Sequence, residues 1–338
     1  MTPRGRWLVL GVIAAMVLSG AVAFGVTAFL GYQQRNAASS SVDIVHASPM
    51  SSGPRVVFRN TGTGQGYGMV ASVPLADPGG ARTLGNLDCN RVYATDENLS
   101  CLRIQRGIAT TFHAVLYDRA GAERDSWALP GIPSRTRISA DSHLVASTAF
   151  VTGMSYASVG FSTQTVIRRT DGRNYGNLED FKTIIDGRQL TAADRNFWGV
   201  TFGADDNTFY ATAASGGHTW LVRGDLAART LTSVHPDAEC PSLSPDGLDV
   251  AYKKNVATGA VSHWAIAVLD LRSGQERVLG ESRSVDDQVE WLDDSTLLYG
   301  LPRSGEAGDS DIWSIAVDAG TSPTLFIEHA WSPSVIRK

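Results

Sequence analysis

The sequence predicts an all-β protein, a six-bladed β-propeller preceded by one N-terminal transmembrane helix. Residues 7–30 form an uncharged, apolar run. From residue 55 onward, short runs rich in Val, Ile, Tyr, Phe and Trp alternate with Gly, Asp, Asn and Pro, which is typical of strands joined by tight turns. An acidic turn also recurs at intervals of about one blade. We therefore expect a cytoplasmic N-terminus (1–6), a membrane anchor (7–30), a polar linker (31–54) and an extracytoplasmic propeller (55–338).

The anchor is predicted from its length and its flanking charges. A helix over residues 7–30 would be about 36 Å long at roughly 1.5 Å per residue, which is enough to cross a hydrocarbon core of about 30 Å. Arg4 and Arg6 precede the run, and Arg35 is the first charge after it. The positive-inside rule therefore places the N-terminus in the cytoplasm and the propeller outside the cell membrane.

Two alternatives concern this anchor. Ala21 and Ala23 form a small-residue pattern like that of a signal-peptide cleavage site, but the apolar run continues to Leu30 and is too long for an ordinary signal peptide. We expect an uncleaved anchor. Small residues at every fourth position would allow two such helices to pack as a homodimer, although they are also common in anchors that do not pair; they are Gly11, Ala15, Ser19, Ala23 and Thr27.

The propeller is predicted from a repeated strand–acidic turn–strand unit. Its six copies are centred on Asp77, Asp118, Asp171, Asp225, Asp270 and Asp318, and their successive spacings are 41, 53, 54, 45 and 48 residues. Each spacing suits one four-stranded blade. The segment Trp331–Arg337 reads as the first strand of a blade, yet the chain stops there. We expect this strand to complete the first blade beside Val56–Phe58, because a closed ring removes exposed sheet edges.

The best-defined blade begins near residue 239. In its Pro-Asp-Gly turn, Pro sets φ at the first central position and Gly tolerates positive φ. The whole signature resembles that of TolB-type β-propellers and consists of Pro241, Ser244, Pro245, Asp246, Gly247 and Asp270 in one blade, with Trp313 and Asp318 in the next. The resemblance covers residues 239–338, whereas residues 56–238 share only the regular spacing of strands and turns. It implies a propeller that binds partners at one face and has no enzyme activity. An anchor and a linker stand where TolB carries an N-terminal α/β domain.

The three cysteines divide into a pair and a single residue. Cys89 and Cys101 bracket a predicted hairpin, and an oxidising compartment would allow them to form a disulfide. Cys240 starts a predicted inner strand, where we expect a small buried side chain. With no C-x-x-C pair among the three cysteines and no paired histidines, the sequence argues against a zinc site.

The sequence lacks complete motifs for nucleic-acid binding, phosphate binding, hydrolysis or calcium binding. The chain has a net charge of −5 and lacks a basic cluster for nucleic acid. The glycine-rich loop 60–68 leads into a strand rather than the helix that a phosphate loop needs. Residues 153–157 resemble a nucleophile elbow without its helix. The acidic runs 205–207 and 309–311 lack the spacing of calcium loops, and the seven histidines are scattered. We expect no catalytic residue, metal ligand or cofactor.

These observations favour a binding role. The predicted function is a membrane-tethered, extracytoplasmic scaffold that binds an envelope protein or polymer without catalysis. The alternative is a propeller enzyme or a carbohydrate-binding sensor at the cell surface. The two differ in whether convergent polar residues line the central channel, which a sequence cannot display.

Overall fold

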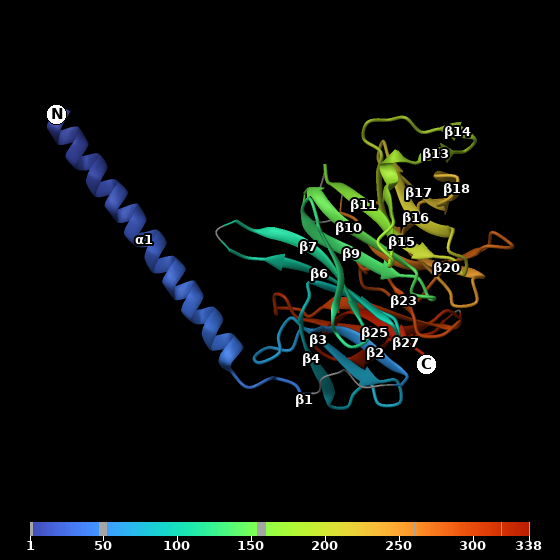
Figure 1. Cartoon of the computed structure of the whole chain (residues 1–338), viewed down its shortest axis with the longest axis horizontal. Coiled ribbons are helices and arrows are strands. Elements are labelled where there is room, and N and C mark those ends of the chain that lie inside the picture. The colour runs from blue at the N-terminus through green and yellow to red at the C-terminus, as the bar shows by residue number, and fades with distance from the viewer. Residues whose placement is uncertain are drawn as a thin grey trace.

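The computed structural model describes residues 3–46, 53–107, 109–153, 160–259, 261–318 and 320–337. Helix α1 (Pro3–Ala37) projects away from a β domain (Figure 1). Its window Leu10–Thr27 has a mean hydropathy of 2.1 and is fully exposed. The helix is therefore long and apolar enough to cross a membrane, as predicted, although it begins before residue 7 and continues past residue 30.

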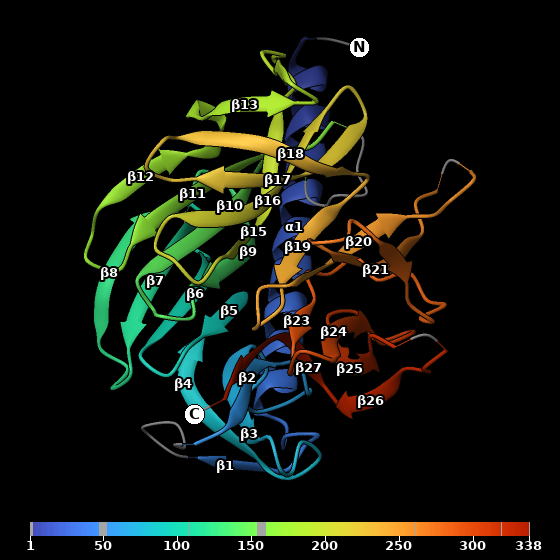
Figure 2. The ribbon, with the colours of Figure 1, turned by 90° about the vertical axis from the view of Figure 1, so that its right-hand side faces the viewer.

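Six sheets form six blades around a common axis (Figure 2), which confirms the predicted fold. The strands of each blade are named from the innermost one outward. Blade 1 contains β27 (Ala330–Ile336), β2 (Arg55–Asn60), β3 (Met69–Pro74), β4 (Arg82–Asp88) and β1 (Ile44–His46). Blade 2 contains β5 (Arg91–Ala94), β6 (Asn98–Gln105), β7 (Thr111–Asp118) and β8 (Glu123–Ala128). Blade 3 contains β9 (Ile132–Ile138), β10 (Leu144–Thr152), β11 (Ser162–Arg169) and β12 (Asn174–Asn177).

The last three blades follow the same order, and blade 4 is enlarged. A short helix η1 (Leu178–Asp180) leads into its two additional outer strands. Blade 4 contains β15 (Asn196–Phe202), β16 (Thr208–Ser215), β17 (His218–Asp225), β18 (Thr230–Pro236), β13 (Lys182–Ile185) and β14 (Arg188–Gln189). Blade 5 contains β19 (Glu239–Leu243), β20 (Asp249–Asn255), β21 (Trp264–Asp270) and β22 (Glu276–Val278). Blade 6 contains β23 (Glu290–Trp291), β24 (Thr296–Pro302), β25 (Ser310–Ala316) and β26 (Thr324–Ile327).

The C-terminal strand closes the ring. Strand β27 pairs antiparallel with β2, with Val335 opposite Val56 and Ser334 opposite Val57. The innermost strand of blade 1 is therefore the last strand of the chain, and the prediction of closure beside Val56–Phe58 is confirmed. The pairing satisfies the backbone groups of β2 that would otherwise form an open edge at the axis.

The acidic repeat lies at one structural position. All six predicted aspartates lie at the end of the third strand of a blade or in the connection to its fourth strand. Where such a carboxylate caps the turn, it accepts backbone hydrogen bonds: Asp118 Oδ1 accepts from Ala122 N at 2.9 Å, and Asp270 Oδ1 accepts from Arg272 N at 2.8 Å. A local bond of this kind stabilises a tight turn, which explains why an acidic residue suits this position in a blade.

The segment after α1 docks on blade 1. Gln65 N donates to Ala38 O at 2.9 Å, and Ser41 N donates to Thr63 O at 2.9 Å. Strand β1 then pairs in parallel with β4. The linker predicted for 31–54 therefore includes the end of α1 and a fifth strand of blade 1. Polar composition predicted a linker in this segment, but it cannot reveal that a backbone edge is available for pairing.

Apolar side chains fill the spaces between neighbouring blades. Between blades 3 and 4, Leu144 and Ile167 pack in one cluster with Phe209 and Val222. Between blades 5 and 6, Trp291 is 1% exposed and its Nε1 donates to Ser242 O at 2.9 Å. Inter-blade packing of this kind holds the inner strands in a ring and so fixes which residues meet at the axis.

Candidate functional site

A pocket opens on the axis of the propeller at one face, and we call it the axial pocket. Its volume is about 560 Å³. Each inner strand runs toward this face, so the turns that follow these strands surround its mouth. All six blades contribute, through residues that include Thr95, Ala140, Ala204, Pro245, Trp291 and Arg337. Concave sites of this kind are common ligand sites.

The base of the pocket is built by one residue from each inner strand. The six residues occupy the same register, because each pairs with the third residue of the next strand in its blade: Tyr93, Arg137, Thr201, Ser242, Glu290 and Ser334. Of these, Tyr93, Arg137, Thr201 and Glu290 line the pocket. Regular alternation along each strand therefore turns these positions toward the axis. Three are ionisable groups from three different blades.

Arg137 is the centre of this layer. Its guanidinium forms an ion pair with Glu290 of blade 6 and lies 4.8 Å from the centre of the Tyr93 ring in blade 2. Arg137 Nη2 also donates to Ser242 Oγ at 3.3 Å and to Val289 O at 3.1 Å. Tyr93 Oη donates to Glu290 Oε1 at 3.3 Å. Arg137 and Glu290 are 6% and 4% exposed, so these buried charges compensate each other.

The pKa values of Tyr93 and Arg137 at the base are both raised. Burial, and next the charge of Glu290, raise the pKa of Tyr93 to about 12, so this phenol keeps its proton at neutral pH. Burial lowers the pKa of Arg137, but the neighbouring Tyr93 and Glu290 more than offset it, and the pKa is raised. The layer is therefore a neutral set of hydrogen-bond donors and acceptors near pH 7.

A second charged group lies near the opposite end of the channel. Lys253, 1% exposed, forms an ion pair with Asp286 and lies 3.5 Å from Glu239 Oε2. Its Nζ is 4.2 Å from the centre of the Trp264 ring. Burial raises the pKa of Glu239, and Lys253 only partly offsets this effect. Burial also raises the pKa of Asp286, but the charges of Lys253 and Arg135 more than offset this effect, and its pKa is lowered overall.

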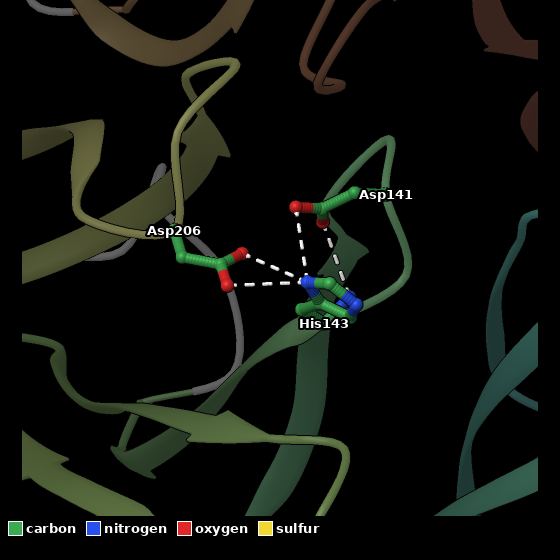
Figure 3. Close-up of side chains that lie close together, drawn as sticks. All are labelled: Asp141, His143 and Asp206. Carbon is green, nitrogen blue, oxygen red and sulfur yellow. Dashed lines mark hydrogen bonds and ion pairs between the residues drawn. The ribbon is translucent and has the colours of Figure 1, made fainter.

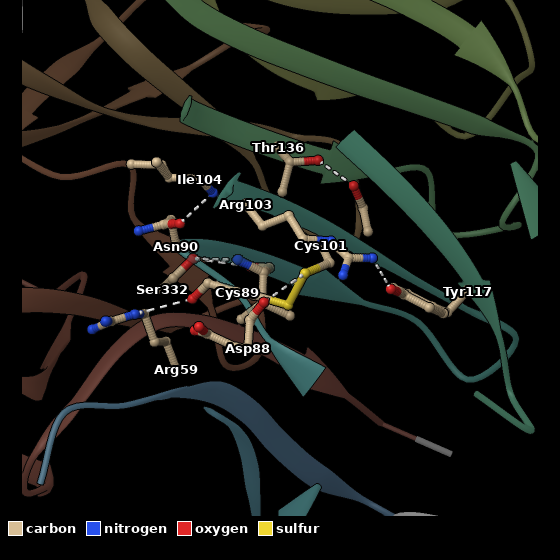
Figure 4. The surroundings of a disulfide bond; sticks show 12 residues. Arg59, Asp88, Cys89, Asn90, Cys101, Arg103, Ile104, Tyr117, Thr136 and Ser332 are labelled. Atoms are coloured by element: carbon tan, nitrogen blue, oxygen red, sulfur yellow. Dashed lines mark hydrogen bonds between the residues drawn. A yellow bond between two sulfur atoms is a disulfide. The ribbon is translucent and has the colours of Figure 1, made fainter. Parts of the chain in front are cut away.

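The predicted disulfide between Cys89 and Cys101 is confirmed (Figure 4). The two Cα atoms are 5.3 Å apart, and both residues are at most 1% exposed. The bond joins the segment before β5 to β6, and Arg59 Nε of blade 1 donates to Cys89 O at 3.0 Å. Cys240 is fully buried, as expected, and burial raises the pKa of its thiol. The disulfide thus supports the junction of blades 1 and 2.

The blade signature lies in turns rather than in a reactive centre. Ser244 Oγ donates to Asp246 Oδ1 at 2.6 Å, Asp246 Oδ1 accepts from Leu248 N at 3.0 Å, and Gly247 has φ of +74°. This turn also lines the axial pocket. Pro241 lies in the buried strand β19, Asp270 is the last residue of the third strand β21, and Asp318 lies between the third and fourth strands of blade 6. Trp313 packs under the Arg283 guanidinium at 3.8 Å.

The structure also brings together three residues that the sequence did not single out as a group. Asp141 and His143 follow the inner strand of blade 3, and Asp206 follows that of blade 4 (Figure 3). His143 Nδ1 is 3.1 Å from Asp206 Oδ2 and 3.3 Å from Asp141 Oδ2. The recurring turn after each inner strand was the available signal, but only the contact between neighbouring blades joins residues this far apart in the chain.

Two motifs that the sequence analysis rejected, the glycine-rich run 60–68 and the elbow-like segment 153–157, lie between strands. The loop after β2 leads into strand β3, so the glycine-rich run 60–68 has no helix behind it. Residues 154–159, which contain Ser155 of the elbow-like motif, lie outside the described residues. The flanking strands β10 and β11 pair antiparallel, whereas a nucleophile elbow joins a strand to a helix.

Comparison with known proteins supports the fold alone. No protein-family model and no curated protein matches this sequence. TolB from Acinetobacter baumannii has 14% identity and a TM-score of 0.58, with 83% of this chain and 66% of that chain covered. A functionally unknown protein from Desulfotomaculum acetoxidans has 10% identity and a TM-score of 0.49, with coverages of 85% and 99%. A periplasmic gluconolactonase from Pseudomonas aeruginosa has 13% identity and a TM-score of 0.44, with coverages of 83% and 98%. The chain thus spans 66% of the length of the A. baumannii TolB and shares the TolB-like propeller fold.

Proposed function

We propose that this protein is a membrane-tethered, extracytoplasmic propeller that binds a protein or envelope-polymer partner at the mouth of the axial pocket. The observation that carries the proposal is the paired state of the pocket base. Arg137 and Glu290 neutralise each other, and Tyr93, whose pKa is raised further above neutral to about 12, is protonated. A catalytic acid or base works best with a pKa near the operating pH, so this layer suits recognition by hydrogen bonds.

The docked tether gives the binding face a defined position. Backbone bonds from Gln65 to Ala38 and from Ser41 to Thr63 join the segment directly after α1 to blade 1. A propeller held this way stays close to the membrane that anchors α1, which raises its effective concentration toward any neighbour on that surface. The partner would then be another component of the same envelope.

Site-specific photo-crosslinking in intact cells tests partner binding. A photoreactive amino acid is placed at Ala140 or Pro245, both exposed at the pocket mouth, and as a control at Val278, which is 51% exposed on outer strand β22. We expect a discrete adduct from the two mouth positions and none from position 278. Equal labelling at all three, or none at the mouth, would reject the proposed site.

The topology is tested separately with cysteine labelling. Ala120→Cys, in the exposed turn between β7 and β8, should react with a membrane-impermeant maleimide added to intact cells. Thr2→Cys should react only after the cells are made permeable. Release of the mature chain into the medium would instead support signal-peptide cleavage.

The alternative of a propeller enzyme rests on the charged group at the other end of the channel. Glu239 has a raised pKa beside the buried Lys253, and shifted groups of this kind often occur at active sites. Screening the full chain against hydrolase, lyase and glycosidase substrates tests it. Turnover that Glu239→Gln abolishes would favour the enzyme over the binding protein.

A further inference from the structure

The cluster of Asp141, His143 and Asp206 has the donor set and spacing of a metal site. One nitrogen and two carboxylate oxygens lie within 4.8 Å of one another. His143 Nδ1 is 3.2 Å from Asp206 Oδ1 and 3.3 Å from Asp141 Oδ2. Donor atoms around a tetrahedral Zn²⁺ lie about 3.3 Å apart, since each is about 2.0–2.1 Å from the ion. Only small movements are needed to place the three donors around one ion.

Each carboxylate is anchored through one oxygen, which leaves the other for the ion. Asp141 Oδ1 accepts from Ser139 Oγ at 2.5 Å and from His143 N at 3.1 Å, so Oδ2 is the oxygen beside the imidazole. Asp206 Oδ2 accepts from Arg169 Nη1 at 2.9 Å, which leaves Oδ1. Outer partners of this kind orient the ligands of metal sites.

The choice of metal follows from the donors. Imidazole nitrogen favours Zn²⁺ over Ca²⁺ and Mg²⁺, and Zn²⁺ also accepts carboxylate oxygens. The side chains of Asp141, His143 and Asp206 are 39%, 53% and 36% exposed, so an ion can reach them from solvent.

We propose that Asp141, His143 and Asp206 bind one Zn²⁺ ion that links the turns of blades 3 and 4 at the rim of the axial pocket. The neighbouring residues Ala140 and Gly203 line that pocket. Three protein ligands leave at least one coordination position for water or for a donor atom from a bound partner. The site is independent of the proposed function, because metal binding can be measured without any partner.

The test is calorimetric titration of the full chain in detergent micelles, after treatment with EDTA and its removal. With ZnCl₂ we expect one equivalent bound per chain, and a weaker response to CaCl₂. Co²⁺ in place of Zn²⁺ should give the visible absorption of a tetrahedral complex with a nitrogen ligand. His143→Ala and Asp206→Asn should each lower the Zn²⁺ affinity by at least about tenfold.

Two matched variants control for indirect effects. Asp171→Asn also removes a carboxylate partner of Arg169, which lies 3.0 Å from Asp171 Oδ2, but Asp171 is not among the three proposed ligands. His218→Ala removes an exposed histidine on β17. Both should bind Zn²⁺ like the wild type, and circular dichroism confirms that every variant is folded. The proposal is overturned if the wild type binds no stoichiometric Zn²⁺, or if His143→Ala and His218→Ala bind it equally.

Discussion

Replacing Ile336 by Ala should lower the free energy of unfolding of the propeller by about 2–5 kcal/mol. Ile336 is 4% exposed on the closing strand β27, opposite Arg55 of β2. It packs in the cluster between blades 1 and 2 that includes Val57, Val92 and Leu99. Truncation to Ala leaves a cavity where the last strand of the chain meets the first blades, so the loss acts on ring closure itself.

The assay is urea denaturation in detergent micelles, followed by tryptophan fluorescence. Seven of the eight tryptophans lie in the propeller, so the signal reports on this domain. The matched control is Leu325→Ala on outer strand β26, where the side chain is 44% exposed and a loss below about 1 kcal/mol is expected. Removal of residues 331–338 should abolish the cooperative transition. An Ile336→Ala variant within about 0.5 kcal/mol of the wild type would refute the role of β27 in closure.

Three further predictions concern the disulfide, the pH dependence and the tether. Replacing Cys89 and Cys101 together by Ser should lower the free energy of unfolding by about 3 kcal/mol, the value for a loop of this length in the chain-entropy model; an unchanged urea midpoint would contradict this. Burial raises the pKa of Glu276, but hydrogen bonds from Lys254, Tyr252 and His235 more than offset it and lower the pKa overall. The ionised Glu276 therefore stabilises the fold above the ordinary pKa of 4.5, and this stabilisation is lost as the pH falls below that value. Glu276→Gln should make the free energy of unfolding fall less steeply on the acid side of a stability–pH profile. Identical acid sides for the variant and the wild type would disprove the assignment. Gly64→Ala should release the tether, because a Cβ atom there would lie 2.3 Å from Ser39 O. Faster hydrogen exchange in residues 38–46 checks this, with Gly121→Ala as the control that shares positive φ but has no atom within 4 Å of its Cβ.

Features written into consecutive residues were predictable from the sequence. The apolar run 7–30, the six acidic turns and the turn Ser244–Gly247 each depend on neighbours within a few positions. The turns appear where expected, and helix α1 contains the apolar run but extends beyond it at both ends. Cys89 and Cys101 could be paired because a single hairpin separates them. Closure by Trp331–Arg337 followed from the unfilled first strand of blade 1, since an open ring would expose a strand edge.

Only the tertiary structure decided which side chains meet at the axis and between blades. Arg137 and Glu290 are 153 residues apart and pair because the inner strands of blades 3 and 6 face each other across the channel. Asp206 is 63 residues from His143 and reaches it only because blades 3 and 4 are neighbours. The docking of residues 38–46 on blade 1 likewise depends on a strand edge far along the chain. The physical reason is that local turn chemistry determines where each blade begins and ends in the sequence. The number of blades, the strand register and the closure of the ring determine the distances between side chains of different blades.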